Sequence, residues 1–225
     1  MNLIDILKAY PYFFASLLSV LILLTAGMIL LTQQQWHVMI LSGLFSVPCF
    51  PFLIFLEKEY WSPARLGGWV LGAEDVFCSF WVAAMVWFAV ALPLRNKIVL
   101  NGGVRIFWRC YAIIAGISVS LFLLFYLMKF GGMSSLLLAY AVAATILVLQ
   151  NRRPWPLSIA GILLFPILYL ALVKLFFEIW PDFVHQWNAL SFWGSTISGM
   201  PRGEITWAII FGFYWPLSMA YVFNI

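Results

Sequence analysis

Charged side chains are scarce in this sequence of 225 residues. Aspartate, glutamate, lysine and arginine together make up 9% of it, whereas hydrophobic residues make up 65%. Soluble proteins carry about 25% charged residues, so this chain has too few to cover a surface in contact with water. Its net charge of +4 is spread over short segments, without the basic run that would indicate a nucleic-acid partner. These shortages exclude a soluble or nucleic-acid-binding protein and favour a membrane environment.

Metal-ligating side chains are also few. The chain has three cysteines and two histidines. The cysteines lie in or beside apolar segments without metal-ligand spacing, and each histidine stands alone near the end of such a segment. We therefore expect inert buried thiols, no metal site and no cofactor. The residues concerned are Cys49, Cys78, Cys110, His37 and His185.

Long apolar segments dominate the chain instead. A helix needs about 20 apolar residues to cross a bilayer, and we find seven such segments. In lipid each must be a helix that satisfies its own backbone, because the alternating pattern of a barrel is absent. The sequence therefore predicts an all-α integral membrane protein, a seven-helix bundle without a soluble domain. The predicted spans are 12–31, 36–56, 72–94, 106–128, 133–150, 157–177 and 203–223.

Seven crossings place the two termini on opposite sides of the membrane. All eight acids fall on or near the N-terminal side, the side that holds the N-terminus. Lysine and arginine tie at six per side, but on the C-terminal side no acid accompanies them. We therefore expect a bacterial inner-membrane protein with its N-terminus outside and its C-terminus cytoplasmic. The C-terminal side carries Arg95, Lys97, Arg105, Arg109, Arg152 and Arg153.

The first three and the last three spans end alike, which predicts an internal repeat. In each set a proline-containing second helix ends in an acid, Glu57 or Glu178, and a tryptophan-containing loop, a glycine-rich approach and an acidic helix start follow. One intervening helix makes the two sets run in the same direction through the membrane. We predict a first three-helix repeat at 1–95, a linker with the fourth span at 96–130, and a second repeat at 131–225.

The acidic helix starts are the candidate sites of chemistry. Spans 3 and 7 enter from the same side, so Glu74, Asp75 and Glu204 lie at matching depth and could face one cavity. Adjacent carboxylates in a poorly solvated place repel, so one of Glu74 and Asp75 should keep its proton and could act as a general acid. The alternative is that these acids only complement the dipoles at the N-termini of their helices.

Apolar and aromatic side chains follow both acidic starts at helical spacing. A proton donor at one end of an aromatic stripe suits a pocket that stabilises a carbocation. Ordinary packing in a membrane bundle produces the same stripe, so this alternative stays open. The residues concerned are Cys78 and Trp81 in span 3 and Trp207, Phe211 and Trp215 in span 7.

Two parts of the sequence resemble a known family. The first is YWSPARL at 60–66 followed by GAEDVF at 72–77. The second is WNAL at 187–190, which leads through SGMP at 198–201 to Glu204. In this order, on three-helix units, they resemble the two repeats of the lycopene cyclase domain family, the non-flavin integral membrane type whose halves are separate subunits or fused. The resemblance covers most of the chain.

The resemblance implies an intramembrane isomerase of carotenoid biosynthesis. An acid protonates a terminal alkene of an isoprenoid, an internal alkene closes the ring, and loss of a proton completes the reaction without a cofactor. It implies Glu74 or Asp75 as the proton donor and Glu204 as the base or electrostatic stabiliser. The implied partners are the membrane and a hydrophobic isoprenoid or lipid, and a homo- or hetero-oligomer stays open. The substrate-binding residues would be Trp61, Arg65, Cys78, Trp81, Trp207, Phe211 and Trp215.

Two departures from the family pattern leave other functions open. The pattern at each acidic start is close to Pro-x-Glu-Glu/Asp, but Gly72 replaces the proline of the first repeat and Gly203 the first acid of the second. The loss at Gly203 would allow an inactive subunit that only binds a lipid or an isoprenoid. A small transporter is a further alternative. It is disfavoured because the acids lie at helix ends and not at breaks in the middle of the membrane.

Overall fold

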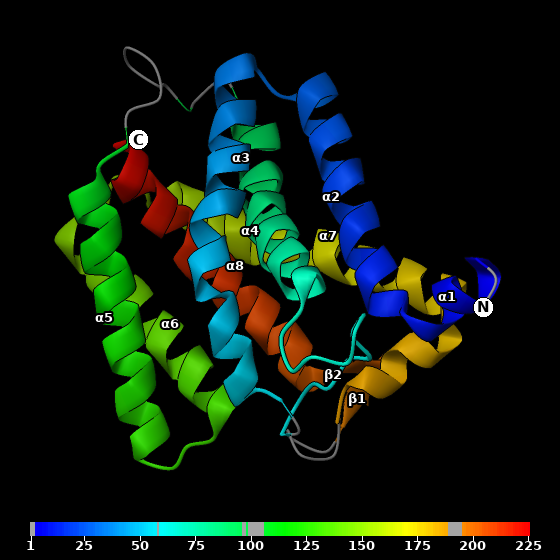
Figure 1. The fold of residues 1–225 in the computed structure, drawn as a ribbon. Helices are drawn as coiled ribbons and strands as arrows, with labels where there is room; N and C mark the ends of the chain where they lie inside the picture. Colours follow the sequence, from blue (N-terminus) through cyan, green and yellow to red (C-terminus); the bar gives the residue numbers. More distant parts are fainter. Residues whose placement is uncertain (1–2, 58, 96–97, 99–105, 189–194) are drawn as a thin grey trace.

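In the part of the chain that the computed structural model describes, seven long helices form the molecule (Figure 1). That part comprises residues 3–57, 59–95, 98, 106–188 and 195–225. Each of the seven is long and apolar enough to cross a membrane. The predicted all-α membrane bundle is therefore confirmed, and each predicted span lies within a few residues of an observed helix. The helices are α2 (Pro11–Leu30), α3 (Gln33–Ser46) continued by the 3-10 helix η1 (Val47–Phe55), α4 (Ala73–Leu94), α5 (Trp108–Leu127), α6 (Gly132–Gln150), α7 (Trp155–Ile179) and α8 (Arg202–Phe223).

Four short elements accompany the long helices on the N-terminal side. They are α1 (Leu3–Ala9), η2 (Pro181–Gln186) and the antiparallel strands β1 (Thr196–Ile197) and β2 (Met200–Pro201). The indole of Trp180 donates to the Leu7 carbonyl at 3.1 Å, which ties α1 to the end of α7. These elements close the end of the bundle at which α4 and α8 begin (Figure 1).

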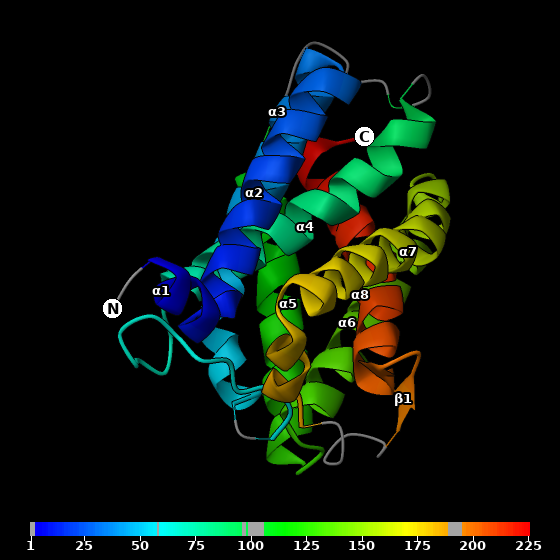
Figure 2. The same cartoon turned by 90° about the vertical axis from the view of Figure 1, so that its right-hand side faces the viewer.

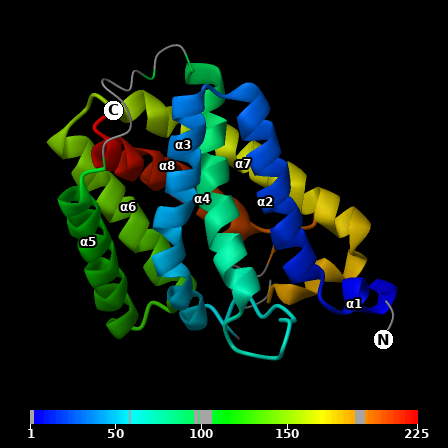
Figure 3. The ribbon, with the colours of Figure 1, turned by 45° about the horizontal axis from the view of Figure 1, so that its top comes forward.

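Helices α4 and α8 form the centre of the bundle. In the most apolar stretch of each, 61% of the residues are buried, against 17% in α5. Helix α4 packs against α2 and α3 (Figure 3), and α8 packs against α6 and α7. The two halves meet where α4 packs against α7 and contacts α8 (Figure 2). A parallel repeat would produce this matched packing, although the repeat and its boundaries stay predictions.

Close approach of backbones holds the second half together. A Cβ atom on Gly161 of α7 would collide with the carbonyl oxygen of Gly212 on α8, and a Cβ atom on Gly212 would collide with that of Gly161. Small residues allow membrane helices to pack this closely because no side chain separates their backbones. This contact sets the separation of α7 and α8, the helices that carry Tyr169 and Glu204.

The second span changes its helix type half-way. The predicted span 36–56 is α-helical up to Ser46 and continues as the 3-10 helix η1. Pro51 lies inside η1 and has no N–H to donate, so an α-helical ladder cannot pass through it. The nine residues of η1 exceed the usual three or four of a 3-10 run. This part of the span is consequently held less firmly by its own backbone.

Candidate functional site

A cavity of about 140 Å³ lies between η1, α4, α6 and α8 on the N-terminal side of the bundle. Its walls are mostly apolar and aromatic, and among the described residues that line it Glu204 is the one carboxyl group. Six of the ten residues predicted for the site line this cavity. They are Glu204, Trp61, Cys78, Trp207, Phe211 and Trp215.

Neutral donors surround the carboxyl group of Glu204. The side chain lies in the first turn of α8, and the residue is 6% exposed. The indole N–H of Trp187 donates to Oε1 at 2.7 Å, and the hydroxyl of Tyr169 donates to Oε2 at 2.6 Å. Tyr60 lines the same cavity, and burial together with the charge of Glu204 raises the pKa of its hydroxyl. Within the described residues, no lysine or arginine forms an ion pair with Glu204.

Asp75, in contrast, has a cationic partner. Arg65 donates from Nε to Asp75 Oδ2 at 2.8 Å and from Nη2 to Oδ1 at 3.3 Å, and its Nη1 reaches Glu57 at 2.8 Å. The Arg65 and Asp75 side chains are 3% and 0% exposed. Burial acts to lower the pKa of Arg65, but the bonds and charges of Asp75 and Glu57 outweigh it, and the pKa is raised. The hydroxyl of Tyr12 donates to Asp75 as well, at 3.0 Å. Asp75 is therefore part of a buried ion pair.

Gly72 fits this arrangement better than the proline of the family pattern would. Its N–H donates to Asp75 Oδ2 at 2.7 Å, and proline has no N–H. The absence of a side chain also leaves room for the Glu74 carboxylate, which would lie 2.6 Å from a Cβ atom at this position. Glu74 is buried and accepts a hydrogen bond from the N–H of Leu66 at 2.6 Å. Both acids in the first turn of α4 thus hold the preceding loop against this helix.

The remaining predicted residues lie behind the cavity wall. Glu74, Asp75, Arg65 and Trp81 are not among the residues that line it. Trp81 stacks on Tyr169, with ring centroids 5.8 Å apart and 14° between the planes. It therefore supports a residue that donates to Glu204. The structure brings Glu204 together with the aromatic residues and leaves the two acids of α4 outside the cavity.

A short backbone pairing connects the two acidic starts. Trp61 and Trp187 form an antiparallel β-bridge, flanked by two backbone hydrogen bonds of 2.8 Å. The ring of Tyr12 meets Trp61 edge-on, with centroids 4.7 Å apart, and the guanidinium of Arg65 lies 5.9 Å from the Trp61 ring. Trp187 in turn donates to Glu204. The Arg65–Asp75 pair thus supports the segment that aligns Trp187.

The predicted aromatic stripe on α8 is a stack of rings. Trp207 and Phe211 lie 5.2 Å apart with 11° between their planes, and Phe211 and Trp215 lie 5.4 Å apart with 23°. Each face of Phe211 is consequently turned toward a neighbouring ring. The indole of Trp215 donates to the Ser42 hydroxyl at 2.8 Å and fixes the far end of the stack to α3. Trp207 is the member of the stack nearest in sequence to Glu204.

The polar partners of Glu204 were not predicted from the sequence. Tyr169 lies within an apolar span, where its hydroxyl needs a partner when buried. That requirement is a signal, but it does not identify a carboxyl group 35 residues later as the partner. Trp187 and Tyr60 lie in the segments that resemble the family, yet no role was assigned to either.

Comparison of the chain with protein families, with curated proteins and with solved structures finds no match. The resemblance to the lycopene cyclase domain family therefore rests on the quoted segments alone. The structure establishes a helical membrane bundle with a carboxyl group at the edge of an apolar cavity. The function has to be argued from this cavity.

Proposed function

We propose that this membrane protein is an isoprenoid cyclase of the lycopene cyclase type, in which Glu204 both gives and recovers the proton. The observation that carries the proposal is the setting of Glu204. Its carboxyl group is buried at one end of an apolar cavity and is bonded by the neutral donors Trp187 and Tyr169. Such a group can serve as a general acid for a substrate that stays in the membrane.

The reaction begins with transfer of the Glu204 proton to a terminal carbon–carbon double bond of an acyclic isoprenoid. A C–H bond forms, the O–H bond breaks, and a carbocation and a carboxylate remain. The donors from Trp187 and Tyr169 already meet both carboxylate oxygens, so the new negative charge needs no rearrangement of the protein.

Ring closure and proton return complete the reaction. An internal double bond attacks the cation, a C–C bond forms, and the positive charge moves to a ring carbon. The Glu204 carboxylate then takes a proton from the neighbouring carbon, which leaves a cyclohexene ring and restores the acid. The neighbouring Trp207 offers the π-electrons that stabilise a desolvated cation. The product is an isomer of the substrate, so one carboxyl group suffices for both proton transfers.

The charges around the cavity favour a hydrocarbon over an isoprenoid diphosphate. Cyclisation of a diphosphate by ionisation needs cations that bind the leaving group. Among the described residues that line the cavity there is no lysine or arginine. Arg65, which lies behind the wall, is occupied by Asp75 and Glu57. Protonation of an alkene requires no such cation.

The proposal is tested by expression in a lycopene-producing host. The wild-type protein should form cyclic carotenoid, and Glu204→Gln should lower the yield about 100-fold or more, because general acid–base catalysis contributes on that order. Pigment chromatography gives the yield, and immunoblotting of the membranes shows that both proteins accumulate equally. Glu178→Gln is the matched control, since Glu178 is an exposed acid on the same side of the bundle.

Two results would contradict the assignment. Full cyclisation by Glu204→Gln, with loss of product in an Asp75→Asn protein that accumulates normally, would make Asp75 the donor. A wild-type protein that co-purifies with unchanged lycopene and forms no cyclic product would be a binding subunit without catalysis.

A further inference from the structure

A second cavity continues the first along α8. It measures about 50 Å³ and shares Cys49, Phe52, Phe122 and Trp215 with the first. It extends along the helix to Val222. Since a helix rises 1.5 Å per residue, the two cavities accompany α8 for roughly 27 Å, nearly all of the hydrocarbon thickness of about 30 Å. Together they form a cleft that runs from Glu204 across the bundle.

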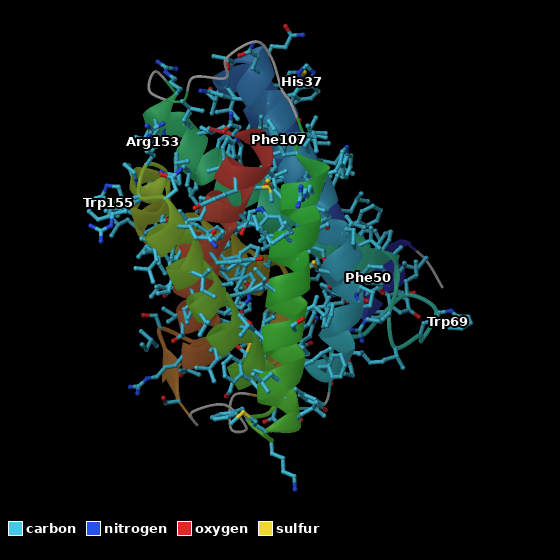
Figure 4. The ribbon with its side chains drawn as sticks, turned by 90° about the vertical axis from the view of Figure 1, so that its left-hand side faces the viewer. His37, Phe50, Trp69, Phe107, Arg153 and Trp155 are labelled. Atoms are coloured by element: carbon cyan, nitrogen blue, oxygen red, sulfur yellow. The ribbon has the colours of Figure 1, made fainter. Side chains whose placement is uncertain are left out.

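This cleft reaches the lipid-facing surface between η1 and α5. Cys49 and Phe52 of η1 and Ala115 and Val119 of α5 line the second cavity and are also partly exposed. We call these four residues the η1–α5 seam. Figure 4 looks onto this face, with α5 in front and η1 beside it.

Aromatic ring contacts close the seam at its two ends. Near the N-terminal side, the rings of Phe52 and Phe55 meet Phe122 with centroids 5.3 Å and 5.2 Å apart. Near the C-terminal side, Phe45 at the end of α3 meets Tyr111 at 4.6 Å. The small side chains of α5 lie between these clusters. An opening flanked by aromatic rings is therefore left half-way along α5.

Neither wall of the seam is held firmly by the bundle. Helix α5 has the lowest buried share of the seven spans in the described chain, at 17%. Opposite it, η1 is a nine-residue 3-10 helix, a form that often marks a hinge when it is this long. Each cavity is smaller than the roughly 300 Å³ at which typical ligand pockets begin, so a ligand has to part these walls.

The chemistry of the cleft beyond Trp215 suits an apolar chain. The hydroxyl groups of Ser118, Tyr214 and Ser218 already have partners in the protein. The Ser118 hydroxyl lies 2.8 Å from the Tyr214 hydroxyl and donates to the Ile114 carbonyl at 2.9 Å, and Ser218 donates to the Tyr214 carbonyl at 3.1 Å. None of the described residues that line the second cavity is an acid, a lysine or an arginine. A charged lipid headgroup would find no countercharge among these residues.

We propose that the cleft behind the η1–α5 seam binds the hydrocarbon tail of a long, unphosphorylated isoprenoid, which enters sideways from the bilayer while its end group reaches Glu204. This inference rests on the proposed function, because the proposed reaction requires an end group at Glu204. To that function it adds the position of the substrate's tail and the route by which the substrate enters from the bilayer. Residues of α5, the helix between the two predicted repeats, thereby become part of the binding site.

The test separates binding from chemistry by using Glu204→Gln as the parent. The full-length parent is expressed in a lycopene-producing host and purified in detergent, and the lycopene retained per protein is measured by absorbance. Ala115→Phe in this parent should lower the retained lycopene about tenfold or more, equivalent to about 1.4 kcal/mol, because its ring fills the seam. Gly116→Phe is the matched control. Gly116 is exposed, and no atom lies within 4 Å of a Cβ atom placed there, so it should retain lycopene as the parent does.

A second variant guards against a folding defect. Cys49→Phe narrows the seam from η1, and it should lower retention as Ala115→Phe does while both proteins elute as the parent does in size-exclusion chromatography. Equal retention in all variants, or no retention in the parent, would overturn the tail site. Loss of retention in both seam variants supports the tail site even if the wild-type protein forms no cyclic product. In that case only the proposed chemistry fails.

Discussion

Asp75 and Glu204 occupy matching sequence positions but lie in different electrostatic environments. Asp75 follows Gly72 by three residues, and Glu204 follows Pro201 by three. Asp75 is paired with a buried arginine, whereas neutral donors bond Glu204. Arg202, two residues before Glu204, is exposed, and no described lysine or arginine forms an ion pair with that carboxyl group. At the scale of single residues, the first acid supports structure and the second is available for chemistry.

The first prediction concerns the buried pair. Arg65→Met should destabilise the protein by about 3 kcal/mol or more, because it leaves Asp75 buried without a cation. Asp75→Asn should cost less, since Arg65 keeps Glu57 as a partner and the amide oxygen still accepts from Gly72. The measurement is equilibrium unfolding of the purified protein in detergent, with the double variant to complete the cycle. Equal and additive losses for the two single changes would show that the pair is not coupled.

Part of the site could be predicted from residue types alone. Glu204 and the stripe of Trp207, Phe211 and Trp215 follow from helical spacing, because these residues share one helix. The preference of Arg65 for Asp75 could not be predicted, because it depends on how the loop before α4 folds back.

At the scale of helices, positions could be predicted but packing partners could not. An apolar run of sufficient length appears directly in the sequence, and the seven spans were found for that reason. Helices that are apolar on all sides do not reveal which face is buried, so the central place of α4 and α8 had no sequence signal. The change of helix type in η1 did have a sequence signal. It is Pro51, which interrupts the backbone hydrogen bonds of the helix locally.

The second prediction belongs to the contact of α7 with α8. Gly212→Ala should destabilise the protein by about 1–3 kcal/mol, the usual cost of overpacking. It should also weaken activity, because separation of these helices moves Tyr169 away from Glu204. Gly116→Ala on α5 is the control, where the space is open and helix propensity alone should stabilise by up to about 1 kcal/mol. Thermal unfolding in detergent gives both values. If Gly212→Ala stabilised the protein as much as Gly116→Ala does, the close contact between α7 and α8 would be refuted.

For the whole molecule, the charges exposed on the two sides of the membrane differ from the charges counted in the sequence. Arg65 is buried between two carboxylates, so it contributes no free charge to the N-terminal side. Glu59 and Glu74 accept backbone hydrogen bonds on that side. The arginines of the C-terminal side that the structure describes are all exposed. They are Arg95, Arg109, Arg152 and Arg153.

The third prediction is that these exposed arginines keep the C-terminal side in the cytoplasm, because positively charged loops are retained there. In a bacterial host, a C-terminal fusion to green fluorescent protein should fluoresce, and one to alkaline phosphatase should be inactive. A phosphatase fusion after Lys129, in the exposed turn between α5 and α6 on the N-terminal side, should be active. The opposite pair of results would reverse the orientation. The Glu204 end of the cleft would then lie next to the cytoplasm and not next to the outer face.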